Sequence, residues 1–205
     1  MLKYLLKFVS EKEYAEQLVS GKLFMRPALY YHRLENGQGD IREAAVDSHT
    51  RMYKCSHYSI YCMYAVHAED LRDNTIMISK RCIDDFKCEN GYIVLIDAEE
   101  FKKRLPTVKT DGHGLRGGQV IYRMLTFPDV ERFLTTTDTD NLFIKHPYFS
   151  YQHEYRIVVE ENLKDYNKTR YEQKEYWFPQ TLDSISKTIP VSSLIKKEDL
   201  YLLKV

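Results

Sequence analysis

The feature that most constrains the fold is a continuous apolar run, Tyr92–Asp97, with the sequence Tyr-Ile-Val-Leu-Ile-Asp. A run without polar alternation is typical of a strand that is buried on both faces of its sheet. Asp97 stands where it would cap a following helix through Arg104, and Pro106 would end that helix. The run therefore predicts a central strand in a covered sheet, followed directly by a short helix.

Further strands are predicted on both sides of this run. In chain order, the segments that predict the remaining elements are the strands Leu2–Val9, Leu23–Tyr31 (interrupted by Pro27), Tyr58–Val66, Gln119–Leu125 and Glu154–Glu160, strand-like stretches near Tyr176 and Leu200, and a short helix after Pro190. Ser10 and Glu13 have the spacing of a capping box, ahead of a helix that Gly21 would end in a left-handed conformation. Asp40 and Glu43 predict a second capped helix.

Strands dominate this pattern, and the helices are short. The absence of regular alternation between strands and helices argues against a doubly wound parallel sheet. We therefore expect an α+β fold in which short helices flank a mixed or mainly antiparallel sheet, either continuous or split. With 205 residues and no internal repeat or obvious linker, residues 1–205 are predicted to form a single domain.

The charge balance narrows the class of function. Lys and Arg number 30, and Asp and Glu also number 30, so the formal net charge is zero. Such a chain has no overall attraction to nucleic acid or to anionic lipid, although a local basic segment such as Lys164–Tyr176 leaves nucleic-acid binding open. No run of about 18 apolar residues predicts a membrane span. Met1–Ser10 is interpreted as a first strand rather than a signal peptide.

Metal chemistry is not expected from the cysteines and histidines. The four cysteines, Cys55, Cys62, Cys82 and Cys88, do not have the spacing of a compact zinc site, and are predicted to be reduced, mostly buried thiols. The seven histidines show neither H-x-x-x-H nor H-E-x-x-H spacing. The glycine-rich segment Asp111–Gly118 matches no phosphate-binding fingerprint and is predicted to be a mobile loop.

A candidate site is centred on the predicted strand Glu154–Glu160. If that strand begins by residue 152, Gln152, Glu154 and Arg156 share one of its faces, about 6.6 Å apart for a rise of about 3.3 Å per residue. An amide, a carboxylate and a guanidinium then stand in one row. The row is either the centre of a catalytic site or a Glu154–Arg156 ion pair on a sheet face.

Three more residues are candidates for holding a ligand. Arg26 follows an early strand, where a guanidinium is well placed to grip a dinucleotide phosphate. Arg33 lies in the same segment, rich in Arg and Tyr, and either contributes to this grip or pairs locally. Ser59, in the predicted central strand Tyr58–Val66, either supports a ligand or is satisfied within the sheet.

Several segments follow one another in a characteristic order over roughly residues 1–160. They are Lys3–Phe8, Ala15–Leu23, Tyr31–Glu35, Gly39-Asp40 with Glu43, Gly91–Asp97, Glu100–Leu105, Val120–Tyr122, Phe143–Lys145 and Phe149–Ile157, the last containing Tyr-Gln-His-Glu-Tyr-Arg-Ile. This order resembles a large family of uncharacterised proteins encoded by phages, prophages and bacterial mobile elements. The resemblance implies a location in the cytoplasm of a bacterial host. It is compatible with a non-enzymatic protein whose surface, rich in tyrosine, binds and inhibits a host or anti-phage defence protein.

The Gln152-x-Glu154 pair, the early Arg26 and the central strand with Ser59 also resemble mono-ADP-ribosyltransferases. This resemblance implies that NAD is a substrate, held by Arg26 and Arg33, with Ser59 supporting the pocket. Glu154 would stabilise the cationic sugar that forms as nicotinamide leaves, and Gln152 would orient the acceptor. Two functions therefore stay open: NAD-dependent transfer or cleavage, and non-enzymatic binding of a host protein.

Overall fold

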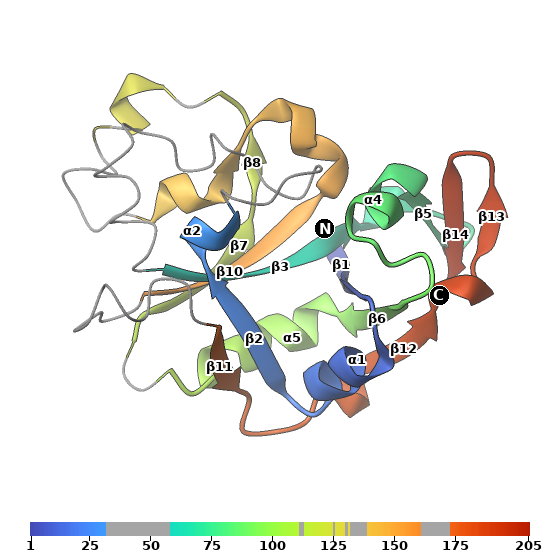
Figure 1. Ribbon diagram of the computed structural model, residues 1–205, viewed down its shortest axis with the longest axis horizontal. Helices are drawn as coiled ribbons and strands as arrows, with labels where there is room; N and C mark the ends of the chain where they lie inside the picture. Colours follow the sequence, from blue (N-terminus) through green and yellow to red (C-terminus); the bar gives the residue numbers. More distant parts are fainter. Residues whose placement is uncertain (32–57, 111–112, 125, 130, 132–138, 161–172) are drawn as a thin grey trace.

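The computed structural model describes residues 1–205 apart from 32–57, 111–112, 125, 130, 132–138 and 161–172, and its main feature is one large sheet (Figure 1). The predicted helix at Asp40 and Glu43 lies outside the described residues. The sheet has eight strands: β1 Leu2–Val9, β2 Lys22–Pro27, β3 Tyr58–His67, β6 Tyr92–Asp97, β7 Leu115–Gln119, β10 Glu154–Glu160, β11 Lys174–Trp177 and β12 Ser186–Pro190.

β3 is the strand around which this sheet is organised. Two strands pair with the same edge of β3, one near each end. β1 pairs near the C-terminal end of β3, and β6 and then β12 follow it in the sheet. β2 pairs near the N-terminal end of β3, and β11 follows it. The opposite edge pairs with β10, followed by β7. All of these ladders are antiparallel, in agreement with the α+β fold and the mainly antiparallel sheet expected from the sequence.

Smaller elements complete the fold. A second sheet has the strand order β13-β14-β5-β4, with β4 Leu71–Arg72, β5 Thr75–Ser79, β13 Ile195–Lys197 and β14 Leu200–Lys204, and β8 Ile121–Tyr122 pairs in parallel with β9 Ile144–Lys145. The helices are α1 Lys12–Val19, α2 Ala28–Tyr31, α4 Lys80–Asp85 and α5 Ala98–Arg104, with 3₁₀ turns η1 Ala68–Asp70, η2 Leu105–Thr107, η3 Asp140–Phe143, η4 Pro147–Gln152, η5 Asp183–Ile185 and η6 Val191–Ser193. Across the described residues, no helix combines the length and apolar character needed to cross a bilayer.

Apolar side chains cover both faces of the large sheet. On one face, α1 and α5 pack over β1, β3 and β10 through residues that include Leu5, Leu18, Phe101 and Ile157 (Figure 1). On the other face lie two separate clusters: one joins β1 and β3 to the second sheet and α4, and one joins β3 and β10 to α2 and η3. Between these two clusters, part of this face of the sheet is not covered by either of them, and a binding site could lie there.

The strands with the strongest apolar pattern form as predicted. Leu2–Val9, Tyr92–Asp97 and Glu154–Glu160 are strands with the predicted bounds. The cap predicted at Asp97 is also present, since its side chain accepts a hydrogen bond of 2.9 Å from the backbone N–H of Glu100. These strands are predictable because most of their residues are apolar or β-formers, although Leu2–Val9 contains two lysines and Glu154–Glu160 contains three charged residues.

Two local predictions need correction. The capping box at Ser10 and Glu13 is wrong: α1 begins after Glu11, whose side chain makes no capping hydrogen bond. Gly21 does take the predicted left-handed conformation, with φ of 96°. Ala28–Tyr31 forms a short helix rather than a continuation of the strand, since Pro27 lacks the N–H that a further ladder bond would need.

The glycine-rich segment also needs correction. Residues 111–112 are not described, but Leu115–Gln119 forms strand β7 instead of a loop, and the following strand is only Ile121–Tyr122. A Cβ on Gly117 would lie 2.4 Å from Leu105 Cδ2 and 2.7 Å from the Tyr155 hydroxyl oxygen. Glycine at position 117 therefore leaves space for the side chains of Leu105 and Tyr155, and a single sequence does not show those neighbours.

Gly91, which precedes β6, should not tolerate alanine. A Cβ there would lie 2.1 Å from the Val9 carbonyl oxygen, which is backbone and cannot rotate away. We expect Gly91→Ala to lower the free energy of unfolding by about 2–3 kcal/mol, measured by urea denaturation. Gly114→Ala is the matched control, because its Cβ would come no closer than 3.7 Å to Glu160 Oε2. Equal stability of the two variants would contradict the close approach of β1 and β6.

Candidate functional site

A gap in the large sheet forms the candidate site. β1 and β2 pair with one edge of β3 at different ends, with Leu6 opposite Tyr64 and Arg26 opposite Ile60. Between these pairs, residues 61–63 pair with β10 on one edge but face no described strand on the other. β1 and β2 diverge here because β1 continues along β6 and β2 continues along β11.

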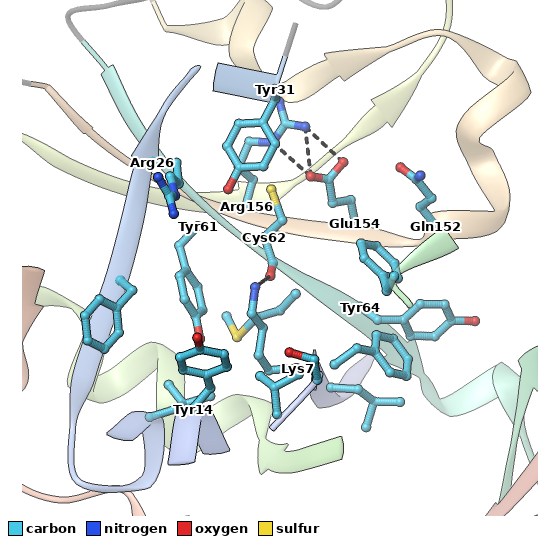
Figure 2. Close-up of a pocket in the computed structure, with 18 of the residues that line it drawn as sticks. Lys7, Tyr14, Arg26, Tyr31, Tyr61, Cys62, Tyr64, Gln152, Glu154 and Arg156 are labelled. Atoms are coloured by element: carbon cyan, nitrogen blue, oxygen red, sulfur yellow. Dashed lines mark hydrogen bonds and ion pairs between the residues drawn. The ribbon is translucent and has the colours of Figure 1, made fainter. Parts of the chain in front are cut away.

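The gap opens into a cleft with a volume of about 490 Å³ (Figure 2). Its walls come from both faces of the sheet: Tyr61 and Met63 belong to the cluster under α1 and α5, whereas Tyr64 and Phe86 belong to or pack against the cluster under the second sheet. Among the described residues, the aromatic rings that line it are those of Phe8, Tyr14, Phe24, Tyr30, Tyr31, Tyr61, Tyr64 and Phe86. This volume lies within the usual range for small-molecule sites.

Basic side chains outnumber acidic ones in the cleft. Among the described residues that line it, five are basic and one is a carboxylate: Lys7, Lys22, Arg26, Lys145 and Arg156 against Glu154. Lys22 pairs with Glu175 at 2.8 Å, outside the cleft lining. Lys7 and Arg26 form no ion pair with a described residue, and the Arg26 guanidinium lies 4.6 Å from the ring centroid of Tyr30. The cleft is therefore suited to an anionic group.

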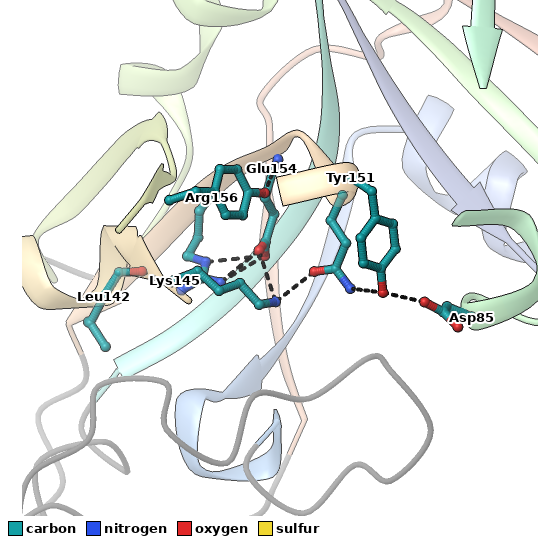
Figure 3. A network of polar contacts seen from close by, with 8 residues as sticks. Asp85, Leu142, Lys145, Tyr151, Glu154 and Arg156 are labelled. Carbon is teal, nitrogen blue, oxygen red and sulfur yellow. Dashed lines mark hydrogen bonds and ion pairs between the residues drawn. The ribbon is translucent and has the colours of Figure 1, made fainter. Parts of the chain in front are cut away.

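Glu154 is held by two cations in the interior of the protein (Figure 3). Arg156 Nη2 donates to both carboxylate oxygens, at 2.8 and 2.9 Å, and Lys145 Nζ donates to Oε2 at 3.2 Å. The side chains of all three residues are nearly inaccessible to solvent, with exposed fractions of 7% or less. Arg156 also donates to the Leu142 carbonyl oxygen. The ion pair proposed from the sequence thus exists, but it is buried and has a third member.

Gln152 joins the same network through its amide. Lys145 Nζ donates to Gln152 Oε1 at 2.8 Å, so one amine bridges Gln152 and Glu154. The amide of Gln152 contacts the Tyr151 hydroxyl at 3.4 Å, and that hydroxyl donates to Asp85 of α4 (Figure 3). The chain of contacts thus runs from α4 to the cleft. Gln152 itself lies in η4, and His153, with φ of 42°, separates it from β10.

The charges around Glu154 set its protonation. Burial of the carboxyl group acts to raise its pKa, but the charges of Arg156 and Lys145 outweigh burial and hold the pKa of Glu154 well below its usual range. Glu154 is therefore ionised at neutral pH, and these three side chains together carry one net positive charge. Because the carboxylate is already shared by two cations, the role that its contacts support is to hold Arg156 and Lys145 in place.

The structure brings together most of the residues selected from the sequence. Gln152, Glu154 and Arg26 all line the cleft, together with several tyrosines. Ser59 is fully buried, opposite Pro27 and Val159 in the paired part of β3, and does not line the cleft. Arg33 lies outside the described residues.

Three lysines that line the cleft, Lys7, Lys22 and Lys145, were not selected from the sequence. Lys3 and Lys7 are the charged residues of the mainly apolar strand Leu2–Val9, and Lys145 follows Phe143-Ile144. A lysine inside such a strand is the signal that could have identified Lys7, because a charged residue is rarely buried without a partner. The same signal also selects Lys3, which is exposed. Lys145 has no such signal, since its two partners come from η4 and β10.

The described cysteines are free thiols. Cys82 and Cys88 are buried in the cluster under the second sheet, and Cys62 is half-buried at the cleft. Cys55 lies outside the described residues. Burial raises the pKa of Cys62 and raises that of Cys88 to about 12, so both are neutral thiols and weak nucleophiles. Within the described part of the chain, no three His, Cys, Asp or Glu side chains gather as metal ligands.

Comparisons with family models, with curated proteins and with solved structures found no match to this chain. The resemblances to phage-encoded proteins and to ADP-ribosyltransferases therefore stay predictions from the sequence. The functional argument starts from the geometry and charge of the cleft.

Proposed function

We propose that the cleft binds a nucleotide, and that NAD or a related dinucleotide is the first ligand to test. The observation that carries this proposal is the lining of the cleft: five basic side chains and one carboxylate beside aromatic rings, among the described residues. Guanidinium and ammonium groups bind phosphate oxygens, and aromatic rings stack on bases. A nucleotide supplies both kinds of group in one molecule.

Arg26 is the basic side chain best placed for the phosphate. It lines the cleft and forms no ion pair with a described carboxylate. Lys145 and Arg156 add positive charge, held in fixed positions by Glu154. Because these two side chains are already ordered, they lose little further conformational entropy when an anion binds.

Binding is supported better than cleavage of NAD. A carboxylate that stabilises a sugar cation must bring negative charge to it, and Glu154 already meets two cations at 2.8–3.2 Å. Transfer or cleavage of NAD therefore remains a subordinate part of the proposal, and it requires that a ligand displace one of these cations.

Calorimetric titration with NAD, ADP-ribose, AMP and adenosine tests the proposal. We expect AMP and ADP-ribose to bind at least about tenfold more tightly than adenosine, because one charge-assisted hydrogen bond contributes about 1.5–3 kcal/mol. The affinity should fall as salt is raised. Nicotinamide release in the NAD sample reports cleavage separately. Equal affinity for AMP and adenosine, or no binding of any of the four, would contradict the proposal and favour the hypothesis of a protein partner.

A further inference from the structure

Lys7 occupies the gap in the sheet itself. The β1–β3 ladder ends at Leu6, and Lys7 is the next residue, paired only with Val94 of β6. Its side chain is half-buried, lines the cleft, and donates from Nζ to the Cys62 carbonyl oxygen at 2.7 Å (Figure 2). The same amine lies 4.1 Å from the ring centroid of Tyr61.

The surroundings of this amine favour its neutral form. Its described contacts are a carbonyl oxygen and an aromatic ring, without an ion-paired carboxylate. Burial lowers the pKa of Lys7 more than the nearby Cys62 and Glu154 raise it. A lysine with a lowered pKa keeps a larger fraction of its amine with a free lone pair at neutral pH, and a desolvated lysine of this kind is a nucleophile.

Anionic ligands would be brought to this amine by the neighbouring basic groups. Arg26 lines the same cleft and has no ion pair with a described residue. An anionic group held there would place the rest of a small ligand in a volume of about 490 Å³ that also contains the Lys7 amine.

We propose that Lys7 is a nucleophilic residue that forms an imine with an aldehyde carried by a phosphorylated ligand. This inference rests on the anion-binding part of the proposed function. The lone pair of Nζ adds to the carbonyl carbon, and the resulting carbinolamine loses water: the carbonyl oxygen leaves with both amine hydrogens, and a C=N bond replaces the C=O bond. The step needs no oxidant or reductant.

Pyridoxal 5′-phosphate is a suitable probe because it combines a phosphate, an aromatic ring and an aldehyde. The full chain is incubated with it at pH 7, reduced with borohydride, and mapped by peptide mass spectrometry. We expect Lys7 to be modified faster than Lys3, which is exposed on the same strand, because burial leaves more of the Lys7 amine neutral at pH 7 and Arg26 holds the phosphate of the probe in the same cleft. This comparison is made within the wild-type protein, so it does not depend on a variant that folds.

Lys7→Arg is the matched variant, because arginine keeps a donor for the Cys62 carbonyl but offers no nucleophilic amine. It should lose the adduct at position 7 and keep the slow labelling of Lys3. Equal rates at Lys7 and Lys3, or no adduct at Lys7, would overturn the inference. Titration of AMP into the unlabelled protein separates the two proposals: AMP binding without an adduct defeats only the imine, and an adduct without AMP binding defeats only the nucleotide site.

Discussion

Replacing Glu154 by glutamine is expected to lower the free energy of unfolding by about 3–5 kcal/mol. The carboxylate is the shared partner of Arg156 and Lys145, and both cations are almost fully buried. Glutamine keeps the size of the side chain and one acceptor, but it leaves two buried positive charges without a negative one. Chemical denaturation followed by circular dichroism measures the loss.

A matched control distinguishes the cost of leaving buried charges unpaired from the cost of losing an exposed ion pair. Glu175 pairs with Lys22 at 2.8 Å, but its side chain is 44% exposed. Glu175→Gln should therefore cost less than about 1 kcal/mol. Adding Lys145→Met to Glu154→Gln should restore part of the stability, because it removes one of the two uncompensated charges. A similar small loss in both single variants would show that water, rather than protein, surrounds the carboxylate.

The same carboxylate predicts a pH dependence with a definite sign. The pKa of Glu154 is lowered in the folded protein, chiefly because the charges of Arg156 and Lys145 outweigh the effect of burial. Its contribution to stability is thus fully present above the unfolded pKa of about 4.3 and is lost as the pH falls toward the folded value. The difference in stability between wild type and Glu154→Gln should be largest at neutral pH and should shrink below about pH 4.

Arg26→Gln is expected to weaken AMP and ADP-ribose binding about 10- to 100-fold. Loss of a charge-assisted contact to phosphate costs about 1.5–3 kcal/mol, and each 1.4 kcal/mol is a factor of ten. The fold should be retained, because the described contact of the Arg26 guanidinium is the ring of Tyr30 and not a buried carboxylate. Calorimetric titration measures the affinity.

Arg72→Gln is the control for this charge change, since Arg72 is exposed on β4 and does not line the cleft. It should leave nucleotide affinity unchanged. Adenosine, which has no phosphate, should bind both variants and wild type alike. Equal weakening by Arg26→Gln and Arg72→Gln would mean that binding responds to overall charge rather than to the cleft.

The fold could be predicted from the sequence where a local pattern decides it. Tyr92–Asp97 is a buried strand made almost wholly of apolar residues, and Glu154–Glu160 contains the apolar run Ile157–Val159, so these patterns do not depend on their neighbours. β7 was missed because its glycines look like loop residues. The space around Gly117 is taken by Leu105 and Tyr155, which come from distant parts of the chain.

The site was predictable to a similar degree. Gln152 and Glu154 were selected because they lie two residues apart, and Arg26 because it follows an early strand. The role of Lys145 could not be predicted, since the bridge that it makes between Gln152 and Glu154 depends on how η4 and β9 fold against β10. That bridge is also what changes the interpretation of Glu154 from a free carboxylate to a shared one.

The open stretch of β3 has a consequence for how the cleft can vary among related sequences. In an antiparallel strand, the N–H and C=O of one residue point to the same edge. The Cys62 carbonyl oxygen accepts from Lys7 in the gap, so the N–H of Cys62 points into the gap as well. This part of the cleft floor is main chain, and sequence drift at position 62 would change its side chain while leaving the donor and the acceptor in place.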